Sequence, residues 1–239
     1  MLAVIGGSGL TRIPELEITD RRIVRTPYGL PSAPLLTGRA GGREIAFLAR
    51  HGMNHALAPH EINYRANIWA LHSLGVEGIV SVSAVAAANP GLPTGALVLP
   101  DDIIDYTCNR AATFFEKDGR EMVHTDFTEP YDPALRQTLL QYAADCGIKL
   151  HPRAVYGCIQ GPRTPTRAEI RRLQRDGADI LGMTGMPEAV LAREIGLPYA
   201  HLCGITGRAG ETVSAEEHSR RSHDTVSLIR RLLTIRPPV

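Results

Sequence analysis

The sequence is poor in aromatic residues and has no block of like charge. Phe, Trp and Tyr make up 5% of its 239 residues, and 26 Lys and Arg balance 25 Asp and Glu, which leaves a formal net charge of +1. Proteins that bind nucleic acid need basic patches, and those that bind single strands also use aromatic platforms. The composition therefore argues against nucleic acid and anionic membranes as partners, and it favours small molecules or further copies of the chain.

Cysteine pairs and long hydrophobic runs are also missing. The four cysteines are widely spaced and form no Cys-x-x-Cys pair; they are Cys108, Cys146, Cys158 and Cys203. This spacing indicates neither a zinc site nor a disulfide framework, and it favours reduced thiols in a cytoplasmic protein. The apolar start Met1 to Ile5 is too short for a signal peptide or a membrane span.

The sequence does contain a regular alternation of strand-like and helix-like segments. Apolar runs predict strands at 2–5, 44–49, 78–83, 96–99, 103–104, 154–159, 179–181 and 198–204. Helical spacing between capping residues and glycines predicts helices at 61–74, 133–146, 167–176, 187–195 and 214–233. Asp132 before Pro133 caps the second of these, and Thr166-Arg-Ala-Glu169 is a capping box that opens the third. We therefore predict one three-layer α/β domain over residues 1–239, with a mixed, largely parallel central sheet flanked by helices. Periodicity does not place the polar stretch 109–124.

Polar residues follow several of the predicted strands at the point where each gives way to a loop. They are Ser8 in Gly6-Gly-Ser-Gly-Leu10, Arg50 with His51, Ser83 with the Ala84 N–H at the start of a small-residue loop, and Thr184. Ligands bind at this side of open α/β sheets, and arginine, hydroxyl and histidine donors suit an oxyanion. The set predicts a phosphate pocket. Ser8 alone also fits a plain turn residue, and a nucleophile lacks support because no Gly-x-Ser-x-Gly pattern surrounds it.

The stretch 180–196 predicts a strand end, a glycine-punctuated turn and a helix. Pro187 suits the first helical position, Glu188 the positive end of the helix dipole, and Gly196 the stop. We expect the turn 182–186 to offer free backbone N–H groups and the Thr184 hydroxyl to an anion. An ordinary strand-to-helix loop has the same glycines, so this stretch alone does not distinguish an anion site from a plain loop. The residues at the other strand ends are needed for that distinction.

His51, His55 and His60 raise the question of a metal site. Histidines four residues apart share a metal only on a helix, and Gly52 and Pro59 argue against a helix here. We therefore expect no metal.

Several motifs resemble the trimeric purine nucleoside phosphorylases, and among them the methylthioadenosine and methylthioinosine phosphorylases. The resemblance spans nearly the whole chain. It rests on Gly6-Gly-Ser-Gly-Leu10, Arg50-His-Gly52, Asn63-Tyr-Arg-Ala-Asn-Ile-Trp-Ala-Leu71, Gln160-Gly-Pro-Arg163 with Arg167-Ala-Glu169, and Gly177-Ala-Asp-Ile-Leu-Gly-Met-Thr-Gly-Met-Pro-Glu188 with Ala192-Arg-Glu194.

The resemblance implies phosphorolysis, with inorganic phosphate as co-substrate and no metal or cofactor. The positions that match the family's phosphate ligands are Ser8, Arg50, His51, Ser83, Ala84 and Thr184. Of these, Arg50, His51 and Thr184 are the candidate catalytic residues, while Met183 matches a residue against the ribose hydroxyls. His55 and His124 match positions at the 5′ end of the nucleoside. The resemblance also implies a homotrimer with sites between subunits, with His124 reaching into a neighbour's pocket.

The base-binding positions depart from the family pattern. Gly207 stands where an Asp or Asn holds the purine, and Ala209 lacks the second carboxylate of adenine-specific members. Thr164 and Pro165 replace an aromatic stacking residue and a base-selecting residue. Backbone N–H groups, Thr206 or Arg208 are possible substitutes at the leaving purine. The methylthioinosine subgroup already departs at these places. The resemblance to this subgroup is strengthened by Thr125-Asp-Phe127 and Gly185-Met186.

Three functions fit these residues. The first is a phosphorylase that converts S-methyl-5′-thioinosine to hypoxanthine and 5-methylthioribose 1-phosphate, or acts on another 6-oxopurine nucleoside. The second is a phosphorylase for an altered nucleoside, and the third is a weakly active paralogue that binds nucleoside or phosphate. A hydrolase is disfavoured because it needs no such complete phosphate site.

Overall fold

The strands form one mixed sheet in the computed structural model, which describes residues 1–115 and 123–234; part of the unassigned stretch 109–124 therefore lies outside the described residues. The strands are β1 (Leu2–Gly6), β2 (Glu17–Arg22), β3 (Leu35–Ala40), β4 (Arg43–Ala49), β5 (Gly78–Ala87), β6 (Leu97–Val98), β7 (Asp102–Tyr106), β8 (Leu150–His151), β9 (Val155–Ile159), β10 (Ile180–Gly182) and β11 (Tyr199–Arg208). Their order is β2-β3-β4-β1-β5-β10-β9-β7, with β11 on the other edge of β5 and β6 and β8 beyond it.

Most pairings are parallel, as predicted. β1 runs parallel to β4 and β5, β11 runs parallel to β5, and β9 runs parallel to β7 and β10. The antiparallel pairs are β2 with β3, β3 with β4, β5 with β10 and β6 with β11. This confirms the prediction of a mixed, largely parallel sheet.

The helices are α1 (Tyr64–Ser73), α2 (Pro133–Asp145), α3 (Arg167–Arg175), α4 (Gly185–Glu194) and α5 (Ala215–Thr234). Their starts follow the predicted capping signals: the Asp132 side chain accepts from Leu135 N, and Thr166 forms a capping box with Glu169. α1 begins later than predicted because the side chain of Asn63 accepts from Ala66 N and fixes the first turn there.

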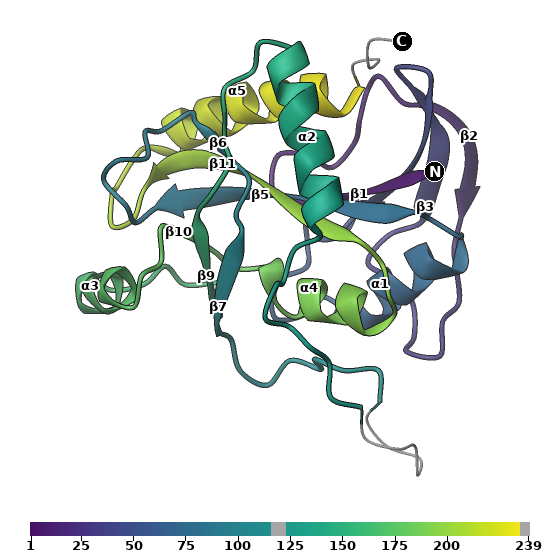
Figure 1. Cartoon of the computed structure of the whole chain (residues 1–239), viewed down its shortest axis with the longest axis horizontal. Helices are drawn as coiled ribbons and strands as arrows, with labels where there is room; N and C mark the ends of the chain where they lie inside the picture. The colour runs from purple at the N-terminus through teal and green to yellow at the C-terminus, as the bar shows by residue number, and fades with distance from the viewer. Residues whose placement is uncertain (116–122, 235–239) are drawn as a thin grey trace.

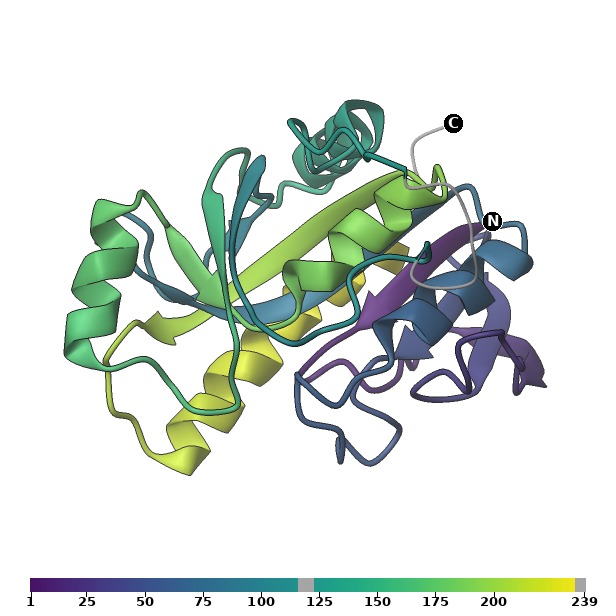
Figure 2. The same cartoon turned by 90° about the horizontal axis from the view of Figure 1, so that it is seen from below.

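The helices lie on both faces of the sheet, which gives the predicted three layers. α5 packs along β11 on one face, and α1 and α4 pack against each other on the opposite face (Figure 1). Figure 2 shows α1 and α4 side by side in front of the sheet. The core between the layers contains fully buried side chains such as Phe47, Leu48 and Tyr156.

The predicted small-residue loop after Ser83 is wrong. β5 continues to Ala87, and its partner β11 continues to Arg208, because the two strands pair in parallel from Ile79 and Tyr199 to their ends. Alanine has weak strand propensity, but pairing and burial in the sheet override that preference.

Candidate active site

A gap in the sheet brings the predicted phosphate residues together. β11 pairs with the whole length of one edge of β5, whereas the other edge pairs with β1 as far as Ser81 and with β10 only from Ala86. β1 and β10 run in opposite directions along β5, so the loops that follow them approach each other beside Ser83. The turn after β4 joins them, since β4 lies next to β1 and ends beside it.

A cavity of about 570 Å³ opens at this gap. Most of the predicted site residues line it, namely Ser8, His51, Ser83, Ala84, Thr164, Pro165, Met183, Thr184, Gly207, Arg208 and Ala209. The volume is typical of a small-molecule site. The cavity extends along β5 from Ser83 to Ala86, beside Gly207, and three residues of strand span about 10 Å. It therefore has two ends, one at the hydroxyl and histidine side chains and one at the segment 207–211.

Arg50 lies behind the first end and is fully buried. Its Nη1 donates to Thr184 Oγ1 at 2.8 Å and to Ser83 Oγ at 3.4 Å, while its Nη2 donates to the Val82 and Ile5 carbonyls at 2.6 and 3.1 Å. Because both hydroxyl oxygens accept from Arg50, their own protons remain available. One of these protons serves the 3.1 Å bond between the two hydroxyls.

Glu188 is the counter-charge of Arg50, a role that the helix-dipole interpretation missed. Its Oε1 lies 3.7 Å from Arg50 Nη1 and accepts from Ser81 Oγ and from the Tyr199 hydroxyl, the latter at 2.8 Å. Both charged side chains are 0% exposed. Sequence offers no signal for this pair, because the two residues are far apart in the chain and Glu188 also suits the first turn of a helix.

His51 is a neutral acceptor and not the extra donor that we predicted. Its Nδ1 lies 2.8 Å from the Leu57 carbonyl oxygen, which can only accept, so Nδ1 carries the proton. Burial, and after it the charge of Arg50, lower the pKa of His51 to about 4. The remaining nitrogen, Nε2, therefore has a lone pair at neutral pH and can accept a hydrogen bond from a protonated ligand oxygen.

Two backbone N–H groups of the turn 182–186, those of Thr184 and Met186, point into the protein and not toward an anion. The N–H of Thr184 donates to the Tyr156 hydroxyl at 3.4 Å, and that of Met186 donates to Cys158 Sγ at 3.2 Å. Met186 and Pro187 also have non-helical dihedral angles, so regular helix begins after Pro187. Gly182, Met183 and Thr184 of this turn line the cavity, and the Thr184 hydroxyl is the side-chain donor among them.

A buried histidine supports the same hydroxyl end. His201 is fully buried, and its Nε2 lies 2.8 Å from Ser83 Oγ. Burial lowers the pKa of His201 well below its usual range, so it is neutral. It fixes the position of the Ser83 hydroxyl without adding charge.

The two remaining predicted histidines do not line this cavity. His55 lies at its edge, where its Nε2 is 3.4 Å from Ser8 Oγ and its ring centroid is 4.4 Å from that of His51. His124 is exposed on the surface of the single chain. Arg50 is likewise absent from the lining, because it lies behind Ser83 and Thr184.

Arg110 holds the wall of the cavity in place, and sequence reasoning missed it. Its Nη1 donates to the carbonyls of Met183 and Met186 at 2.9 and 2.6 Å, and its Nη2 donates to the Gln160 carbonyl at 2.7 Å. These partners are at least 50 residues away in the sequence. Arg110 belongs to the polar stretch that periodicity did not place.

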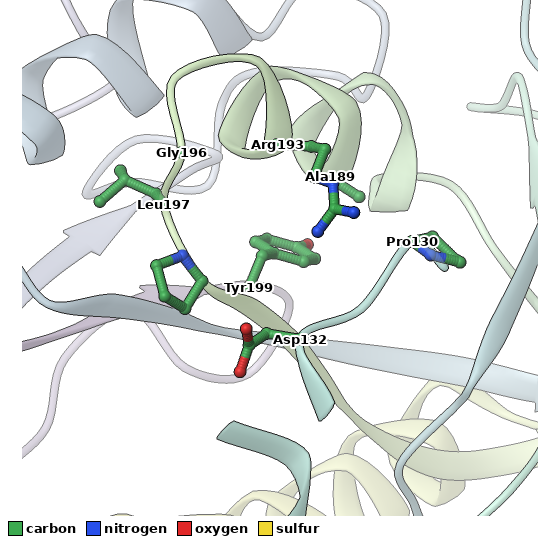
Figure 3. A pocket seen from close by; sticks show the side chains of 8 residues that line it. Pro130, Asp132, Ala189, Arg193, Gly196, Leu197 and Tyr199 are labelled. Atoms are coloured by element: carbon green, nitrogen blue, oxygen red, sulfur yellow. The ribbon is translucent and has the colours of Figure 1, made fainter. Parts of the chain in front are cut away.

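A second, smaller pocket of about 270 Å³ adjoins the buried network (Figure 3). It is lined by the Tyr199 ring, with Arg193 of α4 and Asp132 at the start of α2 nearby. Since the Tyr199 hydroxyl donates to Glu188, this ring separates the pocket from the Arg50–Glu188 pair.

Within residues 1–115 and 123–234, no cluster of three or more His, Cys, Asp and Glu side chains has the arrangement of a metal site. In the same ranges, no helix combines the length and apolar character needed to cross a membrane.

Comparisons with known proteins identify the family of this chain. Residues 1–234 match the family model of the phosphorylase superfamily. The chain is 51% identical to a probable S-methyl-5′-thioinosine phosphorylase of Pseudomonas syringae pv. tomato, over 87% of this chain and 84% of that protein. It is 43% identical to a 6-oxopurine nucleoside phosphorylase of Pyrococcus furiosus, over 99% and 93%.

A solved structure shares the fold as well. Methylthioadenosine phosphorylase from Schistosoma mansoni in complex with adenine superposes with a TM-score of 0.93 and 31% identity, covering 98% of this chain and 89% of that one. A family match over nearly the full length, relatives at about half identity and a shared fold lead to one conclusion. This chain belongs to the phosphorylase superfamily.

Proposed function

We propose that this protein is a purine nucleoside phosphorylase that cleaves S-methyl-5′-thioinosine with inorganic phosphate, giving hypoxanthine and 5-methylthioribose 1-phosphate. The observation that carries the proposal is the two-ended cavity. Hydroxyl groups and a neutral histidine, with a buried arginine behind them, lie at one end, and the segment 207–211 lies at the other. A phosphate and a purine fit these ends, with the sugar between them beside Met183.

The phosphate end suits the dianion HPO₄²⁻. Ser8, Ser83 and Thr184 offer hydroxyl groups, Ala84 offers a backbone N–H, and the Arg50 charge lies directly behind two of these hydroxyls. His51 Nε2 accepts the one O–H of the dianion, so the three charged oxygens face the donors. This arrangement turns a chosen oxygen toward the sugar, which is the positioning contribution to catalysis.

The reaction then needs no metal or cofactor. A phosphate oxygen bonds to C1′ as the C1′–N9 bond breaks and its electron pair leaves with the purine; overall, the proton of HPO₄²⁻ ends on the free base. The sugar carries positive charge in the transition state, and the phosphate beneath it stabilises that charge. The roles of Arg50, His51 and Thr184 as catalytic residues belong to this proposal.

We further propose a cytoplasmic homotrimer in which His124 and His55 line the 5′ end of the nucleoside. Support comes from the exposed position of His124 in the single chain, which leaves it available to a neighbouring subunit, and from His55 at the cavity edge beside Ser8. Four free cysteines support a reducing compartment.

The test is purine release from methylthioinosine, methylthioadenosine, inosine and adenosine, each with and without phosphate, with identification of the sugar product. We expect phosphate-dependent release of hypoxanthine, fastest from methylthioinosine. Equal release without phosphate, or no turnover of any of the four nucleosides, refutes the proposal. Faster turnover of inosine than of methylthioinosine would assign the enzyme to 6-oxopurine nucleosides without the methylthio group.

A further inference from the structure

The base end of the cavity contains a single carboxylate among the described residues that line it, that of Glu211. Arg208 and Arg167 are the charged side chains around it at this end. Glu211 lies outside the motifs that the sequence analysis singled out.

Glu211 occupies the space that a side chain at position 207 would enter. A Cβ built on Gly207 would lie 3.1 Å from Glu211 Oε2. The carboxylate is fixed there by the backbone N–H of Arg208, at 2.8 Å from Oε2, and by Arg221 Nη1, at 3.1 Å from each oxygen. The missing side chain at Gly207 therefore makes room for a carboxylate from four residues further along the chain.

Glu211 keeps capacity for a ligand. A carboxylate has about four acceptor sites, and the bonds from Arg208 and Arg221 use three of them. The Arg208 N–H and then the Arg221 side chain hold the pKa of Glu211 below its usual value, so the group is ionised and can only accept. The Glu211 side chain is 31% exposed, so solvent or a ligand can reach it.

Purines with a 6-oxo group and purines with a 6-amino group differ in the hydrogen-bonding groups at N1 and C6. A 6-oxopurine has an N1–H donor beside the O6 acceptor, whereas a 6-aminopurine has an N1 lone pair beside an amino donor. We propose that the N1 edge of the purine, and not its 6-substituent, faces Glu211, so that the carboxylate accepts the N1–H of a 6-oxopurine and disfavours a 6-aminopurine, whose N1 lone pair would face the negative charge. This inference rests on the proposed function, because it assumes that the purine occupies the end of the cavity beside Gly207.

The test is the variant Glu211→Gln, which keeps the size of the side chain and adds an amide donor for a bare N1. We would titrate hypoxanthine and adenine into wild type and variant in phosphate buffer by calorimetry. A hydrogen bond to a charged group changes affinity by about 10- to 150-fold. We therefore expect the ratio of hypoxanthine to adenine affinity to fall by that factor in Glu211→Gln.

Glu217→Gln is the matched control. Glu217 Oε1 also accepts from Arg221, at 2.7 Å, but Glu217 lies on α5 and does not line the cavity. We expect its affinity ratio to equal that of wild type. The inference is overturned if Glu211→Gln leaves the ratio unchanged, if both variants change it equally, or if wild type binds neither base.

Base binding separates this inference from the proposed reaction. If wild type prefers hypoxanthine through Glu211 but releases no purine from any nucleoside, phosphorolysis fails and the base-selecting role stands. If phosphorolysis occurs and the ratio does not depend on Glu211, the reaction stands and the inference fails.

Discussion

Removing the charge of Glu188 should destabilise the phosphate-free protein and make its stability strongly dependent on phosphate. Glu188→Gln keeps the shape of the side chain and an oxygen that accepts from Ser81 and Tyr199. It leaves the Arg50 guanidinium, which is fully buried, without its counter-charge at 3.7 Å.

The size of the effect follows from burial. Breaking one side of a buried ion pair costs about 3–5 kcal/mol, because an uncompensated charge stays in the interior. For a chain of this length, each kcal/mol lowers the melting temperature by roughly 2–4 °C, so we expect a drop of about 6–20 °C. A bound phosphate restores negative charge beside Ser83 and Thr184. Phosphate should therefore raise the melting temperature of the variant by more than that of wild type.

The assay is thermal and urea unfolding of both proteins across a phosphate titration at constant ionic strength. Glu194→Gln is the control, since Glu194 lies on the same helix and its carboxylate accepts from the Phe114 N–H at 2.8 Å instead of pairing with Arg50. A loss below about 1 kcal/mol in Glu188→Gln would refute the reasoning. An equal response of wild type and variant to phosphate would refute the link between the pair and the ligand.

Three further predictions test the pH response and the cavity wall. Folding lowers the pKa of His51 from 6.5 to about 4, so the unfolded chain binds the proton more readily and stability falls as pH falls through this range. His51→Asn should reduce this loss of stability between pH 7 and pH 5, as measured by urea unfolding. Arg110→Gln should lower kcat/KM by about 10- to 100-fold by shifting the wall, whereas Arg136→Gln, which also loses bonds to three carbonyls but away from the cavity, should keep activity. Gly182→Ala would place a Cβ 2.0 Å from the Tyr156 hydroxyl. We expect it to lose about 1–3 kcal/mol of stability in urea unfolding, and a loss near zero would contradict the packing argument.

Predictions made from local patterns were the most accurate ones. The capping residues Asp132 and Thr166 begin α2 and α3 where expected, because a cap acts within one turn of chain. The glycine-rich turn after β1 follows from a short apolar run and its glycines. The lengths of β5 and β11 were missed, because each strand extends as far as its partner does.

The predictions for the candidate site also differ in accuracy between local features and features that depend on distant residues. Ser8, Ser83 and Thr184 are recognisable in the sequence as hydroxyls after apolar runs, and the structure brings them to one cavity. The error about His51 has a different cause: its protonation state depends on burial and on the charge of Arg50, which no local pattern contains.

The sequence by itself determined the layer architecture, eight of the strands and the residue types gathered at the phosphate end, because periodicity, caps and glycines act over a few residues; it did not indicate β2, β3 or β8. Only the tertiary structure decided which of these groups meet. It turned Arg50 inward to Glu188, directed the N–H groups of Thr184 and Met186 into the protein, and set Glu211 beside Gly207. Such contacts depend on burial and on pairing between separate segments, because the free energy of a charge or hydrogen bond depends on surroundings that exist only once the sheet has formed.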